Sequence, residues 1–440
     1  MKKNLLFLLC SLSVFATAQV TFTRVWERSD SAFTVTSLDA NKKPAYFDDM
    51  NTRGIAVGKI SSNAGDVERV FLVCRNALGN VVRALDINTG ADVKSLNMTD
   101  VTGGGFPISD AGVTEDGILL VSNCTHSSSG LFKVYKWDNE DAAPTLAVSF
   151  ASGSARYGDK ITVTGKYSDG TARIYTIPGG ALSNYKVQYF AMEQVAGVWK
   201  FKQTPDELNT SITASSSNFH QLNPGPNGGY YFRSVGISNA QQIKADLTAN
   251  IGNTYPTTLP QGATSLVYIK TVGGYDYACH LQYGSNANYA APANNKIQVI
   301  KIDRTQGITS AVVLTSSPSF GKLNPGNGAG HVVVYHKGNG DVDIFALSTQ
   351  NGVARYRLSG AEIGTAVSKI NDNTIQIQAS NGSIQIKGIN PSSIELFNTL
   401  GQKVISSTNS NNLNTGSLKG VYIVRVQADE KTVKTEKISL

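Results

Sequence analysis

This 440-residue sequence has few charged residues, because Asp, Glu, Lys and Arg make up only 16% of it. So few charged residues beside 41% hydrophobic ones exclude a coiled coil and a disordered chain. The formal net charge is +7, but residues 19–368 hold 29 basic against 27 acidic side chains, so the excess is largest toward the two ends. A nearly neutral main body argues against nucleic acid as a partner. The length leaves room for two or three domains.

Cysteines and long apolar runs are also scarce. Of the four cysteines, Cys10 lies in a segment that we expect to be removed, and the remaining Cys74, Cys124 and Cys279 lie in or beside apolar runs. An odd number of thiols in such surroundings predicts small buried hydrophobic residues and not a disulfide framework.

Residues 1–18, MKKNLLFLLCSLSVFATA, have two lysines, a short apolar stretch and a final triplet of small residues. This is the pattern of a secretory signal peptide cut before Gln19. The apolar stretch is shorter than the ~20 residues that a membrane-spanning helix needs. No later segment is apolar enough to span a bilayer, so we expect a soluble, exported chain without a transmembrane segment.

Signatures of common catalytic and cofactor sites are missing. The sequence has no GxSxG elbow, Walker loop, dinucleotide fingerprint or HExxH. His331 and His336 are five residues apart, which on a regular strand directs them to opposite faces. Asp341 and Asp343 share a face, but a calcium site needs more oxygen ligands than these. The sequence therefore predicts no catalytic residue, no metal site and no cofactor.

Helical periodicity is almost absent, and short β-rich runs take its place. These runs lie at 70–74, 118–122, 161–164, 230–232, 296–302, 332–335 and 342–346. Turn dipeptides such as Asp116-Gly117 and Asn227-Gly228 separate them. The chain is predicted to be all-β.

One motif recurs along the chain. FHQLNPG at 219–225 returns as FGKLNPG at 320–326, and a fainter copy, FPISDAG, begins at Phe106. The copies are 101 and 113 residues apart, and if each interval spans two units, one unit is about 50 to 57 residues long. Strands that begin near residues 70, 118, 161, 230, 275 and 331 give a mean spacing of about 52 residues.

A period of this length with about four short strands per unit is typical of a β-propeller, whose blades bury their faces against their neighbours. We predict a propeller over residues 19–358 with six blades, seven being the alternative. A strand at 24–28 or at 33–38 would complete the last blade and close the ring, and a hairpin over 185–203 is an insertion or part of a blade. An array of β-sandwiches is the competing architecture.

After a small, polar linker at 359–368, residues 369–440 alternate as six short strands, with Asn381-Gly382 as a hairpin turn between the first two. This pattern predicts a small Ig-like antiparallel β-sandwich. Gly401 and Gly420 fit turns that need a positive φ, and Val421 to Val424 alternate between the two faces of one strand.

The segments SIELFNTLGQKV and LKGVYIVRV, in this order near the C-terminus, resemble the type A C-terminal sorting domain of the Bacteroidetes type IX secretion system (the Por system). The resemblance implies that an outer-membrane translocon recognises this domain and that the protein reaches the cell surface or the medium through the periplasm. The residues that carry the resemblance, and hence the expected sorting signal, are Gly401, Lys403, Val404, Lys419, Gly420, Val421, Tyr422 and Val424.

In the three copies of the motif, Asp110, Asn223 and Asn324 occupy the corresponding place. Loops that lead into propeller blades gather around the central channel, where ligands bind, so these three side chains are our candidate ligand funnel. The local alternative is that each Asn before Pro-Gly bonds to its own backbone in an Asx turn.

The sequence therefore predicts an exported binding or interaction module with a glycan or protein ligand. A propeller hydrolase or lyase acting on polysaccharide is the first alternative, with Asp110 or Asp48 as acid and base. A structural surface protein without a small ligand is the second.

Overall fold

A computed structural model describes residues 20–29, 43–76, 79–126, 130–179, 186–209, 220–234, 240–245, 250–251, 265–282, 295–319, 321, 330–337, 341–360, 376–380, 382–389, 391–399, 401–408, 410–428 and 431–440. The predicted signal peptide, the alternative closing strand at 33–38, most of the predicted linker and Asn324 lie outside these residues. The described part of the chain is all-β, as predicted, apart from three single-turn 3-10 helices at Ala45–Phe47, Pro226–Gly228 and Gly307–Ser310. No helix among these residues is long and apolar enough to cross a membrane.

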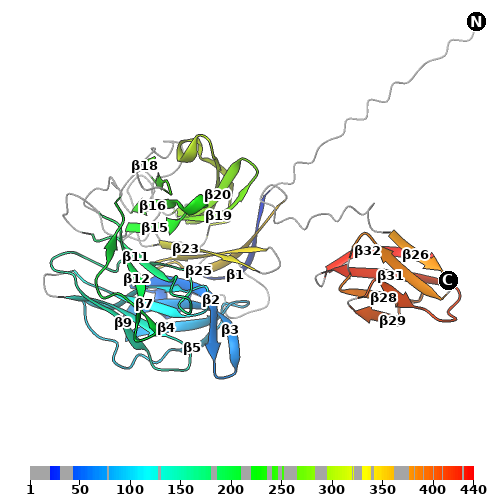
Figure 1. Ribbon diagram of the computed structural model, residues 1–440, viewed down its shortest axis with the longest axis horizontal. Helices are drawn as coiled ribbons and strands as arrows, with labels where there is room; N and C mark the ends of the chain where they lie inside the picture. The colour runs from blue at the N-terminus through cyan, green and yellow to red at the C-terminus, as the bar shows by residue number, and fades with distance from the viewer. Residues whose placement is uncertain are drawn as a thin grey trace, which may run out of the picture. The chain divides into compact units, whose positions relative to one another are not determined.

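The described residues divide into two compact units, which we call the ring unit (20–337 and 341–359) and the C-terminal unit (from 360). The ring unit forms antiparallel sheets that follow one another along the chain, coloured from blue to yellow in Figure 1. Sheet 1 is β2 (Thr52–Ser62), β3 (Gly65–Asn76), β4 (Gly79–Asp86) and β5 (Asp92–Ser95); sheet 2 is β6 (Phe106–Val113), β7 (Leu119–Cys124), β8 (Leu131–Trp137) and β9 (Thr145–Ala151). Sheet 3 is β10 (Thr162–Thr164), β11 (Arg173–Thr176), β12 (Gln188–Val195) and β13 (Val198–Phe201), with β14 (Asp206–Glu207) paired to β12.

The remaining sheets of the ring unit have the same form. Sheet 4 is β15 (His220–Pro224), β16 (Tyr230–Ser234), β17 (Gln241–Ile243) and β18 (Asn250–Ile251); sheet 5 is β19 (Leu266–Val272), β20 (Tyr275–Gln282), β21 (Lys296–Asp303) and β22 (Val312–Ser316). Sheet 6 is β23 (Gly330–His336), β24 (Val342–Ser348) and β25 (Gly352–Ser359), completed by β1 (Thr21–Ser29) from the start of the chain. The predicted strand at 24–28 therefore does complete the last sheet, and the predicted hairpin belongs to sheet 3 as β12 and β13.

The first strand of each sheet lies innermost. β2 contacts β6, β6 contacts β10, β10 contacts β15, β15 contacts β19, β19 contacts β23, and β23 contacts β2 again. This cyclic order is a propeller-like arrangement and not an array of sandwiches. We call the side where these inner strands begin the front side of the ring, and the side where they end the back side.

Apolar side chains fill the spaces between neighbouring sheets. Phe71 and Val73 of sheet 1, for example, pack with Leu119, Val121 and Trp137 of sheet 2 in one buried cluster, and similar clusters join the next sheets. Strands with two buried faces read as apolar runs, which explains why the sequence shows so many of them. Each sheet therefore depends on its neighbours for its core.

The motif repeat and the strand starts do not mark equivalent positions in the sheets. The first copy of LNPG begins inside the inner strand β15, whereas the second precedes β23, which begins only at Gly330. The strand starts counted in the sequence mix inner strands (near 161 and 331) with second strands such as β3, β7, β16 and β20. Both kinds of strand are short and apolar, so sequence alone did not separate them.

The C-terminal unit is a two-sheet sandwich. One sheet is β26 (Gln376–Ser380), β27 (Ser383–Lys387) and β30 (Asn412–Asn414); the other is β29 (Lys403–Thr408), β28 (Ser393–Phe397), β31 (Val421–Ala428) and β32 (Lys431–Ser439). Ile384, Ile386 and Leu413 of the first sheet pack against Ile394, Leu396, Val424 and Val426 of the second. Gly401 and Gly420 have positive φ, as predicted from the turns they occupy.

Candidate functional site

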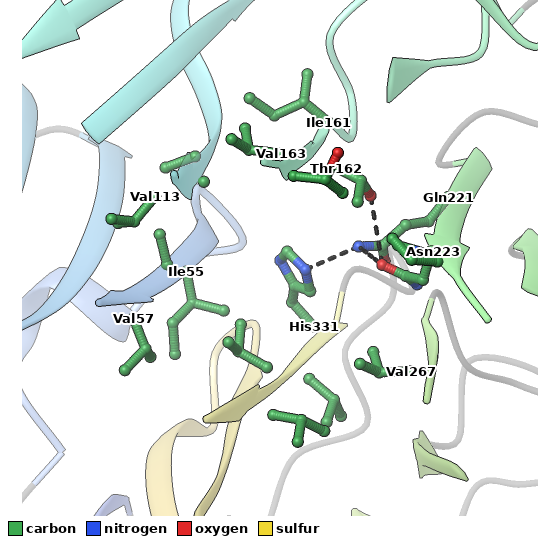
Figure 2. A pocket seen from close by; sticks show the side chains of 18 of the residues that line it. Ile55, Val57, Val113, Ile161, Thr162, Val163, Gln221, Asn223, Val267 and His331 are labelled. Carbon is green, nitrogen blue, oxygen red and sulfur yellow. Dashed lines mark hydrogen bonds between the residues drawn. The ribbon is translucent and has the colours of Figure 1, made fainter. Parts of the chain in front are cut away.

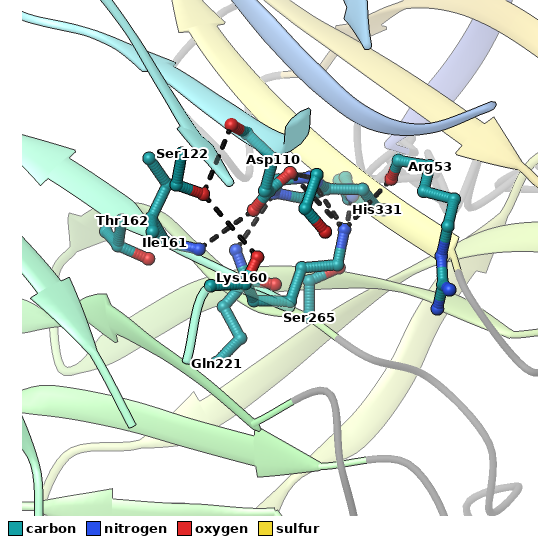
Figure 3. A network of polar contacts seen from close by, with 12 residues as sticks. Arg53, Asp110, Ser122, Lys160, Ile161, Thr162, Gln221, Ser265 and His331 are labelled. Carbon is teal, nitrogen blue, oxygen red and sulfur yellow. Dashed lines mark hydrogen bonds and ion pairs between the residues drawn. The ribbon is translucent and has the colours of Figure 1, made fainter. Parts of the chain in front are cut away.

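A buried ion cluster occupies the centre of the ring (Figure 3). Asp110 on β6 is completely buried, and its Oδ2 accepts a hydrogen bond from the Ile161 N–H at 2.9 Å. Its Oδ1 lies 3.5 Å from Lys160 Nζ and 3.4 Å from His331 Nδ1. Lys160 Nζ also donates to the carbonyl oxygen of Arg53 at 3.1 Å. The carboxylate of Asp110 on β6 is thus linked to β2, to the residues just before β10 and to β23.

His331 extends this cluster into an amide chain (Figure 2). Its Nε2 lies 2.9 Å from Gln221 Nε2, and the same Gln221 nitrogen lies 3.4 Å from Asn223 Oδ1. His331 Nδ1 also lies 3.3 Å from Lys160 Nζ, so the imidazole contacts Asp110 and Lys160 on one side and Gln221 on the other. Asn223 in turn donates to the Leu266 carbonyl at 3.0 Å and accepts from Thr162 Oγ1 at 3.3 Å. The chain therefore joins strands of sheets 3, 4, 5 and 6.

Burial and mutual charge set the protonation of this cluster. Burial alone opposes ionisation of Asp110, but Lys160 and His331 outweigh it, so the pKa of this carboxyl lies below its usual value. Burial and the Lys160 cation lower the pKa of His331. Burial likewise holds the pKa of His280, completely buried on β20, well below its usual value. These imidazoles are therefore neutral in the folded protein at neutral pH.

We expect acid to destabilise the ring before its carboxylates titrate. A histidine whose folded pKa is depressed stabilises the fold above the unfolded pKa of about 6.5, and this stability is lost as the pH falls toward the folded pKa. While only the unfolded form binds the proton, each such histidine lowers the free energy of unfolding by about 1.4 kcal/mol per pH unit. The Tm of the mature chain should thus fall between pH 7 and pH 5, and His331→Gln should remove part of that slope. A Tm that is flat over this interval, or a slope that His331→Gln leaves unchanged, would contradict the assignment.

Beside this cluster lies a cavity of about 470 Å³ lined by every inner strand (Figure 2). Its walls are mainly aliphatic, with Ile55, Val57, Val113, Val163 and Val267 among them. Gln221, Asn223 and His331, all buried, form its floor on the front side. Glu115, Pro224 and His336 also line it and are exposed, and each lies at or just beyond the end of an inner strand. The cavity therefore opens toward the back side of the ring.

Two of the three predicted funnel residues lie at this centre. Asp110 belongs to the ion cluster and Asn223 to the cavity floor, and His331 and Gln221 link them; Asn324 lies outside the described residues. The side-chain partners of Asn223 lie on other strands and on its own strand's Gln221, and none belongs to an Asx turn. Asp48, the alternative acid, has an exposed side chain that pairs with Lys43 and does not line the cavity.

Sequence reasoning missed Lys160, Gln221 and the role of His331. Lys160 directly precedes a predicted strand and reads as an ordinary solvated lysine, yet it is only 3% exposed. The spacing of His331 and His336 predicts only that these two side chains do not share a metal ion. No group of three or more His, Cys, Asp or Glu side chains able to hold a metal occurs among the residues that the structure describes. The one available signal was polar residues at the start of otherwise apolar inner strands.

In the C-terminal unit, Gly401, Lys403, Val404, Lys419, Gly420 and Val421 are exposed, whereas Val424 is buried and Tyr422 partly so. Residues 358–440 match the family model described as "Secretion system C-terminal sorting domain". Residues 358–440 are a Por secretion sorting domain. The sorting domain implies handling by the type IX secretion machinery and export across the outer membrane to the cell surface or the extracellular space.

The ring unit is similar in fold to known propeller proteins. A crystal structure of a DUF4623 family protein from Bacteroides eggerthii superposes with a TM-score of 0.55 at 14% sequence identity, covering 79% of this chain and 84% of that one. A putative gluconolactonase (TM-score 0.40, 13% identity, 78% and 94% covered) and virginiamycin B lyase from Staphylococcus aureus (TM-score 0.35, 12% identity, 84% and 96% covered) also match. No curated protein matches the chain. The protein thus joins a propeller-like ring to a sorting domain.

Proposed function

We propose that this protein is a six-bladed β-propeller that is exported by the type IX system and acts as a binding module outside the cell. The observation that carries this proposal is the cavity of about 470 Å³ at the centre of the ring. Ligand sites are typically ~300–1,000 Å³ in volume, mostly apolar, with a few well-placed polar groups. An aliphatic wall above Gln221, Asn223 and His331 has this composition. It would accept the projecting end of a glycan or protein ligand.

The arrangement of carboxylates favours binding over polysaccharide hydrolysis. A glycosidase of the usual kind needs two carboxyl groups about 5–9.5 Å apart that both face the substrate. Glu115 is the single carboxylate among the described residues that line the cavity. Asp110 lies behind the floor, where Lys160 and His331 engage one of its oxygens and the Ile161 N–H the other. A carboxylate held in this way stabilises the ring and is poorly placed to exchange protons with a substrate.

The cavity also favours a ligand over a purely structural role. Side chains that only closed the ring would be expected to fill its centre to the density of a protein interior, in which voids larger than a water molecule are few. Instead a cavity remains that exposed residues line at the back side, and its floor holds Gln221, whose Oε1 is buried without a hydrogen-bond partner among the described residues. A buried acceptor of this kind costs free energy unless a ligand or water satisfies it.

Filling the cavity tests the proposal. Val267 lines the wall with a partly buried side chain, so Val267→Phe would occupy ligand space without removing any bond of the floor. On an array of defined oligosaccharides and peptides, the labelled mature chain should bind at least one probe, and Val267→Phe should weaken that binding tenfold or more. Val198→Phe, at a 57% exposed position on β13, is the matched control and should bind normally. Binding that survives Val267→Phe in a folded protein would remove the cavity as the site.

A further inference from the structure

A second group of charged residues lies on the front side of the ring, on the other side of the cavity floor. Arg75 is the last residue but one of β3, Arg53 lies near the start of β2, and Arg156 lies in the connection between β9 and β10. Because β2 and β3 are antiparallel, the end of β3 and the start of β2 share this side. None of these three arginines lines the cavity, so the group is separate from the site proposed above.

Arg75 has unusual surroundings for a buried arginine. It is only 7% exposed, its guanidinium carbon lies 3.6 Å from the centroid of the Phe106 ring, and its Nη1 lies 3.5 Å from Ser109 Oγ. Its Nε is buried without a hydrogen-bond partner, and no carboxylate among the described residues forms an ion pair with it. A guanidinium presents five N–H donors, so most of the hydrogen-bonding capacity of Arg75 is unused.

Neighbouring charges raise the free-energy cost of burying the Arg75 guanidinium. Burial and the nearby Arg53 cation lower the pKa of Arg75 to about 10. The carboxylate of Asp159 opposes this lowering, but its oxygens form their hydrogen bonds with the Arg156 guanidinium. The carboxylate of Asp110 is engaged by Lys160 and His331. A buried cation that lies beside a like charge and forms no direct ion pair is destabilising, and strongly perturbed buried groups of this kind are candidates for functional sites.

We propose that Arg75, supported by Arg53, forms a binding site for the carboxylate group of an acidic ligand. A guanidinium binds a carboxylate through two parallel N–H···O bonds, and stacking on the Phe106 face fixes its plane for that geometry. The site has a route to solvent, because Phe106 is partly exposed, its ring lies 5.3 Å from that of the exposed His126, and Gly105 beside it is exposed. The ligand is either a small free carboxylate or a uronic acid unit of a glycan, both of which present the same group.

The test is ligand-induced stabilisation of the mature full-length chain. Glucuronate, an oligogalacturonate and neutral glucose are the probes, and the Tm is measured against probe concentration. A carboxylate probe should raise the Tm of the wild type and glucose should not. Stabilisation by the oligomer alone would assign the site to a glycan, and equal affinity for both acids would assign it to a small carboxylate. Absence of a shift with either acid would overturn the proposal.

Substitutions distinguish a ligand site from a structural arginine. Arg75→Gln should raise the Kd for the acid tenfold or more while leaving the Tm without probe unchanged or higher, because it removes an unmatched buried charge. Arg173→Gln is the control, since among the described residues the Arg173 side chain donates to the carbonyl oxygens of Gly170 and Ala172; this variant should bind the acid like wild type. A large loss of Tm in Arg75→Gln with unchanged affinity would show that Arg75 is structural and contradict the proposal. Val267→Phe should leave the acid response intact, so failure of the cavity and failure of this site are distinguishable.

Discussion

Asp343→Ala is expected to lower the free energy of unfolding of the ring unit by about 3–5 kcal/mol, because it leaves a buried arginine without its counter-charge. Asp343 on β24 is completely buried and lies 2.6 Å from Arg355 Nη2 and 3.0 Å from Arg357 Nε. Arg355 is itself only 2% exposed. Its Nη1 donates to the Ile87 carbonyl of sheet 1 at 2.6 Å. The carboxylate therefore holds the cation that joins the last sheet to the first.

This junction has further contacts that the loss would weaken. Trp26 of β1 donates from Nε1 to the same Ile87 carbonyl at 2.9 Å, and its ring packs with Phe345 of β24. Arg28 of β1 pairs with Asp92 of sheet 1 at 2.7 Å. In a ring, the contact between the first and last sheets is the one that connects residues far apart in sequence, so forming it carries the largest loop-closure cost. A weakened junction should therefore lower the stability of the whole ring.

Chemical denaturation followed by near-UV circular dichroism or tryptophan fluorescence measures the effect. Asp343→Asn keeps the shape but not the charge and should lie between wild type and Asp343→Ala. Asp138→Ala is the control, because Asp138 pairs with Lys136 at the surface and such pairs contribute only ~0–1 kcal/mol. A loss below 1 kcal/mol for Asp343→Ala would mean that Arg355 finds another partner or water, and would contradict this account of the junction.

Local sequence patterns were enough for the elements but not for the centre of the ring. Alternation and turn residues predicted the all-β class, the closing strand and the sandwich at the C-terminus, since each depends on residues close in sequence. Alternation also gives the face of a strand on which a side chain lies. It does not give the partner across the ring, which is why Lys160 and Gln221 could not be assigned to one buried cluster from the sequence.

The recurring motif also fails to predict contacts across the ring. It selected Asp110 and Asn223, which lie in the inner strands β6 and β15 at the ring centre. It aligned them with Asn324, although the residue of sheet 6 that meets Asp110 is His331, seven positions later. Arg75 had still less signal, since it follows the apolar run that ends in Cys74 and its role depends on Phe106 of the next sheet. Contacts between sheets form only when the ring closes, so they cannot be predicted from a single sequence without the fold.

Deleting residues 369–440 is expected to abolish delivery to the cell surface and to trap the protein in the periplasm. The secretion machinery acts on the sorting domain, which the deletion removes almost entirely, while the predicted signal peptide still directs passage across the inner membrane. The ring unit should fold without it, because it is a compact unit with its own cores. Cell fractionation with immunoblotting, in a bacterium that has a type IX system, measures the distribution.

A reporter fusion and three point variants distinguish a loss of recognition from a loss of folding. A reporter that carries the same signal peptide and residues 358–440 should reach the surface, and the truncated chain should keep the Tm of the ring unit.

Val404→Asp and Val421→Asp change side chains that are 40% and 41% exposed on the sorting domain, so they should reduce delivery without unfolding the sandwich. Val424→Asp, at a completely buried position, should unfold it and serves as the positive control for loss of the domain. Normal surface delivery of the truncated chain would contradict the export route, whereas normal delivery of both exposed variants would move the recognised surface elsewhere on the same domain.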